Sequence, residues 1–397
     1  MISRRVARAA LAAICTASIA LLSACGEEDG GSSDGTFKIG VATAQTGAIA
    51  PFDKPAVDGL EVAVELINEN GGLDGEHSVE LELKNTRSDP AQTATAAQEL
   101  VDGGADLLIV PCDGDLALAG GPIGQDAGIP TMSICSSVPI LPDEIGDYFF
   151  GISYGDNAGS AVLANYALDE GYETAYTLNS EDTVYTDKVP VYFGEAFEAG
   201  GGEVVGSDSF TIGQQDFSAI VTRIGQLNPA PDVIMTSAYE PDFPAFIRQL
   251  RGAGIDTPVI GSDGIDTPTV LDLGDSVNGL VHNSSGLPEP GSELEKFYED
   301  FESVQGNSVE SVYSAVGADI IPVLDAAVEA AGSTEASAVR DAIAELEDVK
   351  GYTGPITYAD TNGMPIKQIA VVEVQNGERE LLENVVPEAG DIPDPQP

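Results

Sequence analysis

The sequence predicts an α/β protein built as two doubly wound units, each a mainly parallel sheet covered by helices. Short apolar segments of strand length alternate with amphipathic helical segments along most of the chain. This strand–helix–strand spacing requires parallel sheets with right-handed crossovers. About 360 residues follow the N-terminal leader, too many for one ordinary core, and the alternation restarts after residue 154.

The first unit begins with a predicted strand over Phe37–Ala44. A helix over Asp58–Glu69 follows, because Leu60, Val64 and Ile67 share one helical face and a Gly-Gly pair ends it. The remaining elements are a strand over 79–83, a helix that starts at 88–90, and apolar strands over 107–110 and 129–134.

The second unit repeats the pattern. Its predicted helices cover 161–168, 191–199, 220–227 and 243–251, and its strands cover 174–178, 203–207, 233–236 and 259–261. The C-terminal part contains a long apolar helix over 311–330, strands over 355–358 and 366–374, and a hairpin turn at Asn376-Gly377 that leads into 380–382. The Pro- and Asp-rich segment 387–397 is expected to be a disordered tail.

The N-terminus indicates secretion. Arg4, Arg5 and Arg8 precede an apolar segment over 9–22 that is too short to span a bilayer comfortably. It ends in Leu-Ser-Ala-Cys-Gly, which resembles a bacterial lipobox, so we expect a signal peptide over 1–25 and lipidation of Cys25. An ordinary signal peptide with an incidental cysteine is the alternative. Residues 26–36 are expected to be a flexible tether to the outer face of the cytoplasmic membrane.

The chain is strongly acidic. It has 16 lysines and arginines against 66 acidic residues, a formal net charge of -50. Such a surface repels nucleic acid and anionic lipid, so no nucleic-acid partner is expected. The acid is spread along the whole sequence, which favours a role in solubility or salt adaptation over a local acidic binding site.

Cys112 and Cys135 each end an apolar, strand-like segment. Outside the cell such a pair favours a disulfide over a metal site, and two free buried thiols are the alternative. No metal site is expected.

Enzyme signatures are weak. The sequence contains neither a phosphate-binding G-x-x-x-x-G-K-[ST] loop nor an H-E-x-x-H motif. Its only histidines, His77 and His282, are expected at the surface or in loops. Residues 151–155 fit the G-x-S-x-G pattern of hydrolases, but no helix follows the serine at once, as a nucleophile elbow requires. The glycines at 200–202 end a helix and do not follow a strand, so we expect no cofactor and no catalysis.

Five segments carry a family resemblance. They are Lys38–Val41 with Thr46-Gly47, Gly59–Gly72, Ser88–Pro90, Gly201–Val205 with Asp216–Ser218, and Gly354–Tyr358. In this order and spacing, the chain from residue 37 to about 386 resembles the type I periplasmic binding proteins, and among them the leucine/isoleucine/valine-binding protein family of ABC importers.

The resemblance implies two α/β lobes joined by a hinge of three crossover strands. Lobe 1 would cover 37–153 and 287–354, and lobe 2 would cover 154–286 and 355–386. The ligand would sit between them at the carboxyl ends of strands, and hinge closure would enclose it.

The resemblance also implies ligand-binding residues. Phe52 falls where the family often has an aromatic side chain over the ligand, and Ser136 and Ser137 fall where it holds a carboxylate. Tyr185 and Tyr239 match aromatic residues that close from lobe 2, and Asp263 matches the acid that takes an ammonium group. Hydroxyls suit an anion, a buried carboxylate suits a cation, and aromatic lids exclude water.

Asp113 departs from the family pattern, which usually has a small hydroxyl residue there. A carboxylate ~4 Å from a ligand carboxylate costs on the order of 4 kcal/mol near a protein surface. Three outcomes are open: Asp113 points away and offers its backbone N–H, it binds a cationic or hydroxyl group, or the ligand is not an α-amino acid.

The sequence therefore predicts the binding protein of an ABC importer, with permease and ATPase subunits as partners and an amino acid or similar polar molecule as ligand. Glu240 and Asp242 beside Tyr239 favour a ligand that carries positive charge. The alternatives are a binding protein for an amide, polyamine or other solute, and a ligand-sensing receptor domain.

Overall fold

The structure, a computed structural model, describes residues 35–397. The predicted signal peptide, the lipobox with Cys25 and almost all of the predicted tether lie outside the described residues. Within 35–397, no helix is both long enough and apolar enough to cross a membrane.

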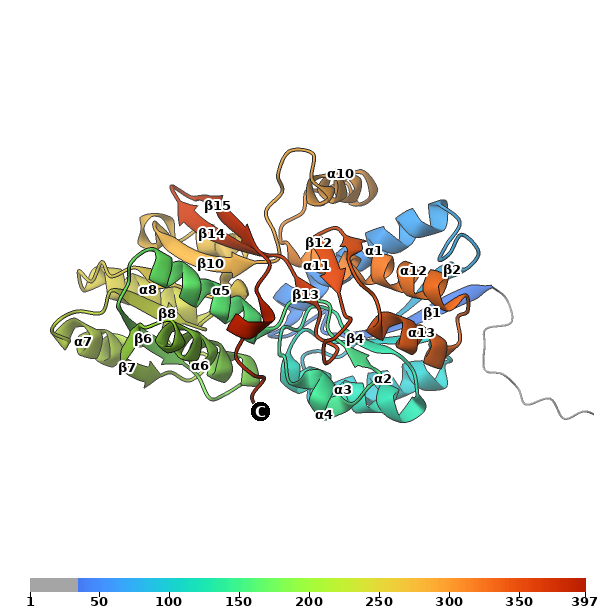
Figure 1. Cartoon of the computed structure of the whole chain (residues 1–397), viewed down its shortest axis with the longest axis horizontal. Coiled ribbons are helices and arrows are strands. Elements are labelled where there is room, and N and C mark those ends of the chain that lie inside the picture. The colour runs from blue at the N-terminus through green and yellow to red at the C-terminus, as the bar shows by residue number, and fades with distance from the viewer. Residues whose placement is uncertain (1–34) are drawn as a thin grey trace, which may run out of the picture. The chain divides into compact units, whose positions relative to one another are not determined.

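Five parallel strands form the first sheet, in the order β2-β1-β3-β4-β5. Figure 1 labels β1, β2 and β4 of this sheet. Because the strands are parallel, their carboxyl ends meet at one edge. The strands are β1 (Thr36–Thr43), β2 (Ser78–Asn85), β3 (Leu107–Val110), β4 (Thr131–Ser133) and β5 (Phe149–Phe150), and the helices between them are α1 (Ala50–Glu69), α2 (Pro90–Asp102), α3 (Gly114–Ala127) and α4 (Leu141–Ile145).

Both faces of this sheet are covered. Ile39 and Val41 of β1 pack into a core that includes α1, whereas Ala42 packs into a second core with α2 and α3. Successive residues of a strand point to opposite faces, so one strand contributes to both cores. The predicted doubly wound arrangement is confirmed.

The second sheet has seven strands, in the order β15-β14-β10-β9-β8-β6-β7. Strands β6 to β10 are parallel, and β14 runs antiparallel to both β10 and β15. A two-residue turn joins β14 to β15, and Asn376 and Gly377 adopt the positive φ values of 54° and 80° that this hairpin needs. The strands are β6 (Thr174–Asn179), β7 (Glu203–Ser209), β8 (Val233–Thr236), β9 (Val259–Ile260), β10 (Leu280–Ser284), β14 (Ile369–Gln375) and β15 (Glu378–Val385).

Helices cover this sheet on both faces too. One core contains residues of α5 (Asp156–Asp169) and α6 (Val184–Ala199), and the other contains residues of α7 (Ser218–Gln226) and α8 (Asp242–Gly252). The short helix α9 (Pro268–Leu271) and the 3-10 turns Asp263–Ile265 and Gly274–Val277 follow β9.

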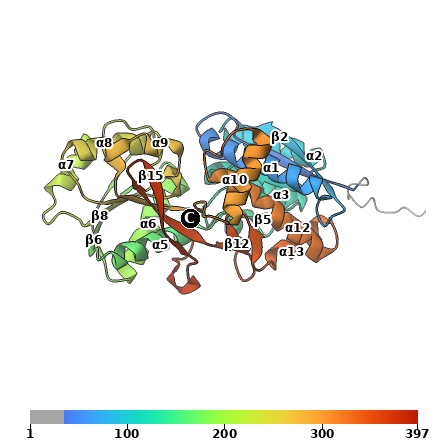
Figure 2. The same ribbon diagram turned by 90° about the horizontal axis from the view of Figure 1, so that it is seen from above.

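The segment after β10 returns to the first core. Figure 2 shows α10, α12 and α13 on the same side as α1 and α2. Gly59 of α1 and Gly317 of α11 allow the two helices to touch, because a Cβ on either would clash with the backbone of the other helix. The elements are α10 (Glu293–Gln305), α11 (Tyr313–Ala318), α12 (Ile320–Ala331), α13 (Ala336–Ala344), and an antiparallel sheet of β11 (Val349–Gly351), β12 (Gly354–Thr357) and β13 (Ile366–Lys367).

Three segments connect the two lobes: residues 151–155, 285–292 and 368. This matches the three-strand hinge of the predicted fold class. The predicted lobe bounds stay a prediction, but Ile356 and Tyr358 pack in the first core, whereas Ile369 and Val371 pack in the α5–α6 core.

A buried ion pair joins two of these connections. Lys367 Nζ lies 2.8 Å from Asp319 Oδ2 and donates to the carbonyl oxygen of Ile152 at 3.0 Å. Asp319 also accepts hydrogen bonds from the backbone N–H of Tyr352, at 2.6 Å, and from the Thr353 hydroxyl. The pair therefore ties the first and third connections to the start of α12.

Four expectations differ from the structure. The single helix over 311–330 is two helices that meet at Asp319, and the strand over 366–374 is interrupted at Gln368, where the chain changes sheets. The tail is docked: Gln396 N–H donates to the Tyr192 hydroxyl at 2.7 Å, so its proline residues do not prevent ordered packing. His282 is fully buried in β10, because this central strand is covered on both faces.

Candidate functional site

A pocket lies at the carboxyl ends of strands from both lobes. First-lobe residues come from α1, from the segments after β3 and β4, and from α11. Second-lobe residues come from the start of α6 and the segments after β8 and β9. The pocket is lined by all seven predicted ligand-binding residues: Phe52, Asp113, Ser136, Ser137, Tyr185, Tyr239 and Asp263. Their role in binding a ligand stays a prediction.

Asp113 is the N-cap of α3. Its carboxylate accepts a hydrogen bond from the backbone N–H of Leu116 at 3.0 Å, which satisfies one of the free donors at the helix start. Burial raises the pKa of Asp113, and the nearby Asp115 carboxylate raises it further. Asp113 thus lines the pocket and caps the helix at the same time.

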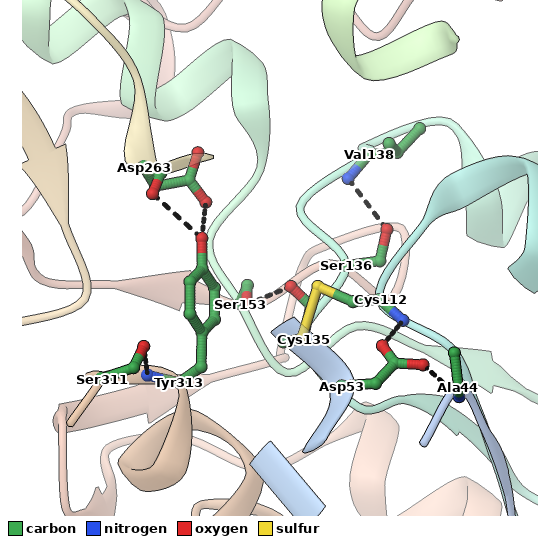
Figure 3. Close-up of a disulfide and its surroundings, with 10 residues drawn as sticks. All are labelled: Ala44, Asp53, Cys112, Cys135, Ser136, Val138, Ser153, Asp263, Ser311 and Tyr313. Carbon is green, nitrogen blue, oxygen red and sulfur yellow. Dashed lines mark hydrogen bonds between the residues drawn. A yellow bond between two sulfur atoms is a disulfide. The ribbon is translucent and has the colours of Figure 1, made fainter. Parts of the chain in front are cut away.

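Figure 3 shows the two side chains that contact Cys112, the residue before Asp113: Cys135 and Asp53. The structure pairs the sulfur atoms of Cys112 and Cys135, whose Cα atoms lie 4.6 Å apart, so the ends of β3 and β4 meet next to the pocket. The fully buried Asp53 accepts hydrogen bonds from Ala44 N–H at 2.6 Å and Cys112 N–H at 2.8 Å. Burial raises the pKa of Asp53 to about 7.

Tyrosine hydroxyl groups from both lobes donate hydrogen bonds to Asp263. Tyr185 of α6 donates to its carboxylate at 2.9 Å, and Tyr313 of α11 donates to its backbone carbonyl oxygen at 3.0 Å. Figure 3 shows Tyr313 pointing at Asp263. Since α11 belongs to the first lobe and Asp263 to the second, this hydrogen bond closes the cleft across the lobes.

Aromatic rings complete the closure. Phe52 packs edge-on against Tyr239 of the second lobe, with ring centroids 5.9 Å apart, and against Tyr313 at 5.5 Å. Tyr185 lies 6.1 Å from Tyr239. These rings remove the polar groups of the pocket from water, which strengthens any electrostatic contact with a ligand.

A second buried acid stands close to Asp263. Asp156, at the start of α5, is 4% exposed, and its backbone N–H donates to the Ser137 carbonyl oxygen at 2.7 Å. Burial raises its pKa well above the usual value, and the negative charge of Asp263 adds to the shift. Burial likewise raises the pKa of Asp263 to about 6. Burial and mutual repulsion thus make the charged forms of these two carboxyl groups costly, and a nearby cation would reduce this cost.

Sequence reasoning missed Asp156 and Tyr313. Asp156 carries no predicted role, and Tyr313 falls within the apolar helix predicted over 311–330. A polar hydroxyl in an otherwise apolar segment was the available signal for Tyr313. Two predicted contributors lie elsewhere: Glu240 accepts from the Thr267 hydroxyl at 2.8 Å, and Asp242 accepts from Gly213 N–H at 2.9 Å, and neither lines the pocket.

Residues 36–379 match the periplasmic binding protein family, and the chain belongs to this class of two-lobed binding proteins. Within the class it is a type I protein of the leucine/isoleucine/valine-binding protein family.

Three similar proteins illustrate the relationship. A Leu/Ile/Val-binding protein of Rhizobium johnstonii is 25% identical over 344 residues, which are 85% of this chain and 92% of that protein. A leucine-binding protein of Thermotoga maritima superposes with a TM-score of 0.79 at 27% identity, over 88% of this chain and 99% of that one. A branched-chain amino acid transporter substrate-binding protein of Streptococcus pneumoniae was solved with isoleucine. It superposes with a TM-score of 0.79 at 23% identity, over 89% of this chain and 100% of that one.

Proposed function

We propose that this chain is the extracytoplasmic solute-binding protein of an ABC importer and captures an amino acid or amino-acid-like polar molecule between its lobes. The family supports this role, since its members work outside the cytoplasm and the relatives described above are binding proteins rather than enzymes. The observation that carries the proposal is Asp263, a carboxylate at the centre of an aromatic pocket with no cationic partner among the described residues.

Asp263 would hold the ligand's ammonium group. Its carboxylate has the Tyr185 hydroxyl as a partner, and its burial makes an unpaired negative charge costly. A ligand ammonium would remove that cost. Because the ligand would contact Asp263 in one lobe and Asp113 or Ser136 in the other, it would stabilise the closed arrangement more than the open one.

The anchor, the disulfide and the partners are further parts of the proposal. Cys25 would carry the lipid that keeps the protein at the outer face of the membrane, and the Cys112–Cys135 bond would persist in that oxidising compartment. The permease and ATPase subunits of the importer would receive the loaded protein, and no catalytic step is proposed.

A thermal-shift screen of the purified protein against amino acids, amides and polyamines tests the proposal. A ligand at ~100 times its dissociation constant adds about 2.7 kcal/mol to the free energy of unfolding, a clear rise in melting temperature. Asp263→Ala should abolish the rise. Asp256→Ala, which removes an exposed carboxylate of the same lobe outside the pocket, should leave it intact. No rise with any compound, or an equal rise in Asp263→Ala, would refute the proposed site.

A further inference from the structure

The charged side chains that line the pocket are all acidic. Its lining contains two carboxylates, those of Asp113 and Asp263, and neither lysine, arginine nor histidine. Buried Asp156 lies next to this lining. A zwitterionic ligand brings one positive and one negative charge, so it would leave the acidic excess of the pocket uncompensated.

Two buried acids away from the pocket are paired with a cation. Asp319 has Lys367 at 2.8 Å, and Asp266 has Arg379 at 2.9 Å. Within residues 35–397, neither Asp113 nor Asp263 makes such an ion pair. Buried Asp53 and Asp242, by contrast, have no cation and accept hydrogen bonds from backbone N–H groups. The Asp263 carboxylate accepts the Tyr185 hydroxyl, so a ligand cation would supply its counter-charge.

The start of α3, where a ligand carboxylate could bind, is already occupied within the protein. The Asp113 carboxylate accepts the Leu116 N–H there at 3.0 Å, and this is the place where a bound anion would sit. A ligand carboxylate would therefore meet a negative charge where a helix N-terminus would otherwise attract it.

The remaining wall suits a cation. Phe52, Tyr185, Tyr239 and Tyr313 surround Asp263, and their ring centroids lie 5.5 to 6.1 Å from one another in the pairs that touch. The face of an aromatic ring is the negative end of its quadrupole and attracts ammonium groups, most strongly when water is excluded. Carboxylates and ring faces thus favour the same sign of charge.

We propose that the pocket selects amino compounds with a net positive charge and holds their ammonium group among these rings between Asp263 and Asp113. This inference rests on the proposed function, because it specifies the charge class of the ligand for the same site. Asp113 is then the residue that determines specificity, since it puts a negative charge where a carboxylate would otherwise bind.

Two matched pairs of probes test the inference by calorimetric titration at neutral pH. L-Leucinamide differs from L-leucine by loss of the carboxylate charge, and L-lysine differs from L-norleucine by gain of an ammonium group. In at least one pair, the net-positive compound should bind at least tenfold more tightly than its neutral partner. In no pair should the neutral compound bind more tightly. Asp113→Asn should reduce the preference to less than threefold.

The variant is conservative because asparagine is also a good N-cap, so α3 keeps its start. Asp89→Asn is the matched control: Asp89 caps α2 in the same lobe by accepting Gln92 N–H at 2.9 Å, lies outside the pocket, and should leave the preference unchanged. Tighter binding of L-leucine or L-norleucine would overturn the inference and leave the proposed function intact. Binding of none of the four probes would also overturn it, while the thermal-shift screen decides the proposed function separately.

Discussion

Replacing Lys367 by methionine tests the buried ion pair at the hinge. Lys367 is 2% exposed and Asp319 is fully buried, so neither charge can recover water while the protein stays folded. Methionine fills most of the space of the lysine side chain but removes its charge. The substitution leaves the Asp319 carboxylate with its hydrogen bonds to Tyr352 and Thr353 but without a counter-charge.

Removing one partner of a buried ion pair lowers the free energy of unfolding by about 3–5 kcal/mol, because the other charge is left uncompensated in a medium of low polarity. The carbonyl oxygen of Ile152 also loses its donor at 3.0 Å, which adds about 1 kcal/mol. We therefore expect Lys367→Met to lower the free energy of unfolding by about 4–6 kcal/mol.

Urea denaturation measures this loss. Lys350→Met is the matched control, because the Lys350–Glu293 pair has a similar separation of 2.9 Å but the lysine side chain is 75% exposed. Exposed pairs contribute about 0–1 kcal/mol, so the control should hardly change the midpoint. Equal effects of the two substitutions would refute the reasoning, since burial would then not decide the strength of the pair.

Three further outcomes are expected. Asp53→Ala should lower the free energy of unfolding by about 2–6 kcal/mol, since the buried N–H groups of Ala44 and Cys112 each lose an acceptor at about 1–3 kcal/mol; an unchanged urea midpoint contradicts this. The Cys112–Cys135 bond, which joins residues 23 apart, should add about 3 kcal/mol, and denatured, unreduced protein should titrate no thiol from this pair. Calorimetric affinity for an ammonium ligand should fall as the pH drops through about 6, because protonation removes the Asp263 charge; a flat profile from pH 5 to 7 would argue against ammonium binding there.

The fold could be predicted because its signals are local. Apolar runs such as 107–110 and the face of Leu60 and Val64 each fix one element, and their order fixes the sheets. The helix over 311–330 was predicted as one element because its apolar pattern continues through Asp319. Pro322 is the local signal that this pattern overlooks, because it has no N–H to donate to the carbonyl oxygen of Ala318 and so interrupts the helix near Asp319.

The candidate site was predictable only as far as family resemblance reaches. Residues such as Asp263 follow strand ends in the expected order, and they do meet in one pocket. The place of Asp156 and Tyr313 at the site was not predicted, because it depends on contacts between segments that are distant in the sequence. The Tyr313 hydroxyl, for example, donates a hydrogen bond to Asp263, fifty residues away. The second role of Asp113, as a helix cap, also requires knowing where α3 begins.

Native mass spectrometry of the purified protein, mixed with the common amino acids, their amides and polyamines, tests the central claim most directly. The protein should retain one molecule from the mixture at a stoichiometry of one to one, and Asp263→Asn should lose it under the same conditions. A spectrum without a bound molecule, or the same complex with Asp263→Asn, would contradict capture of a small polar ligand at this pocket.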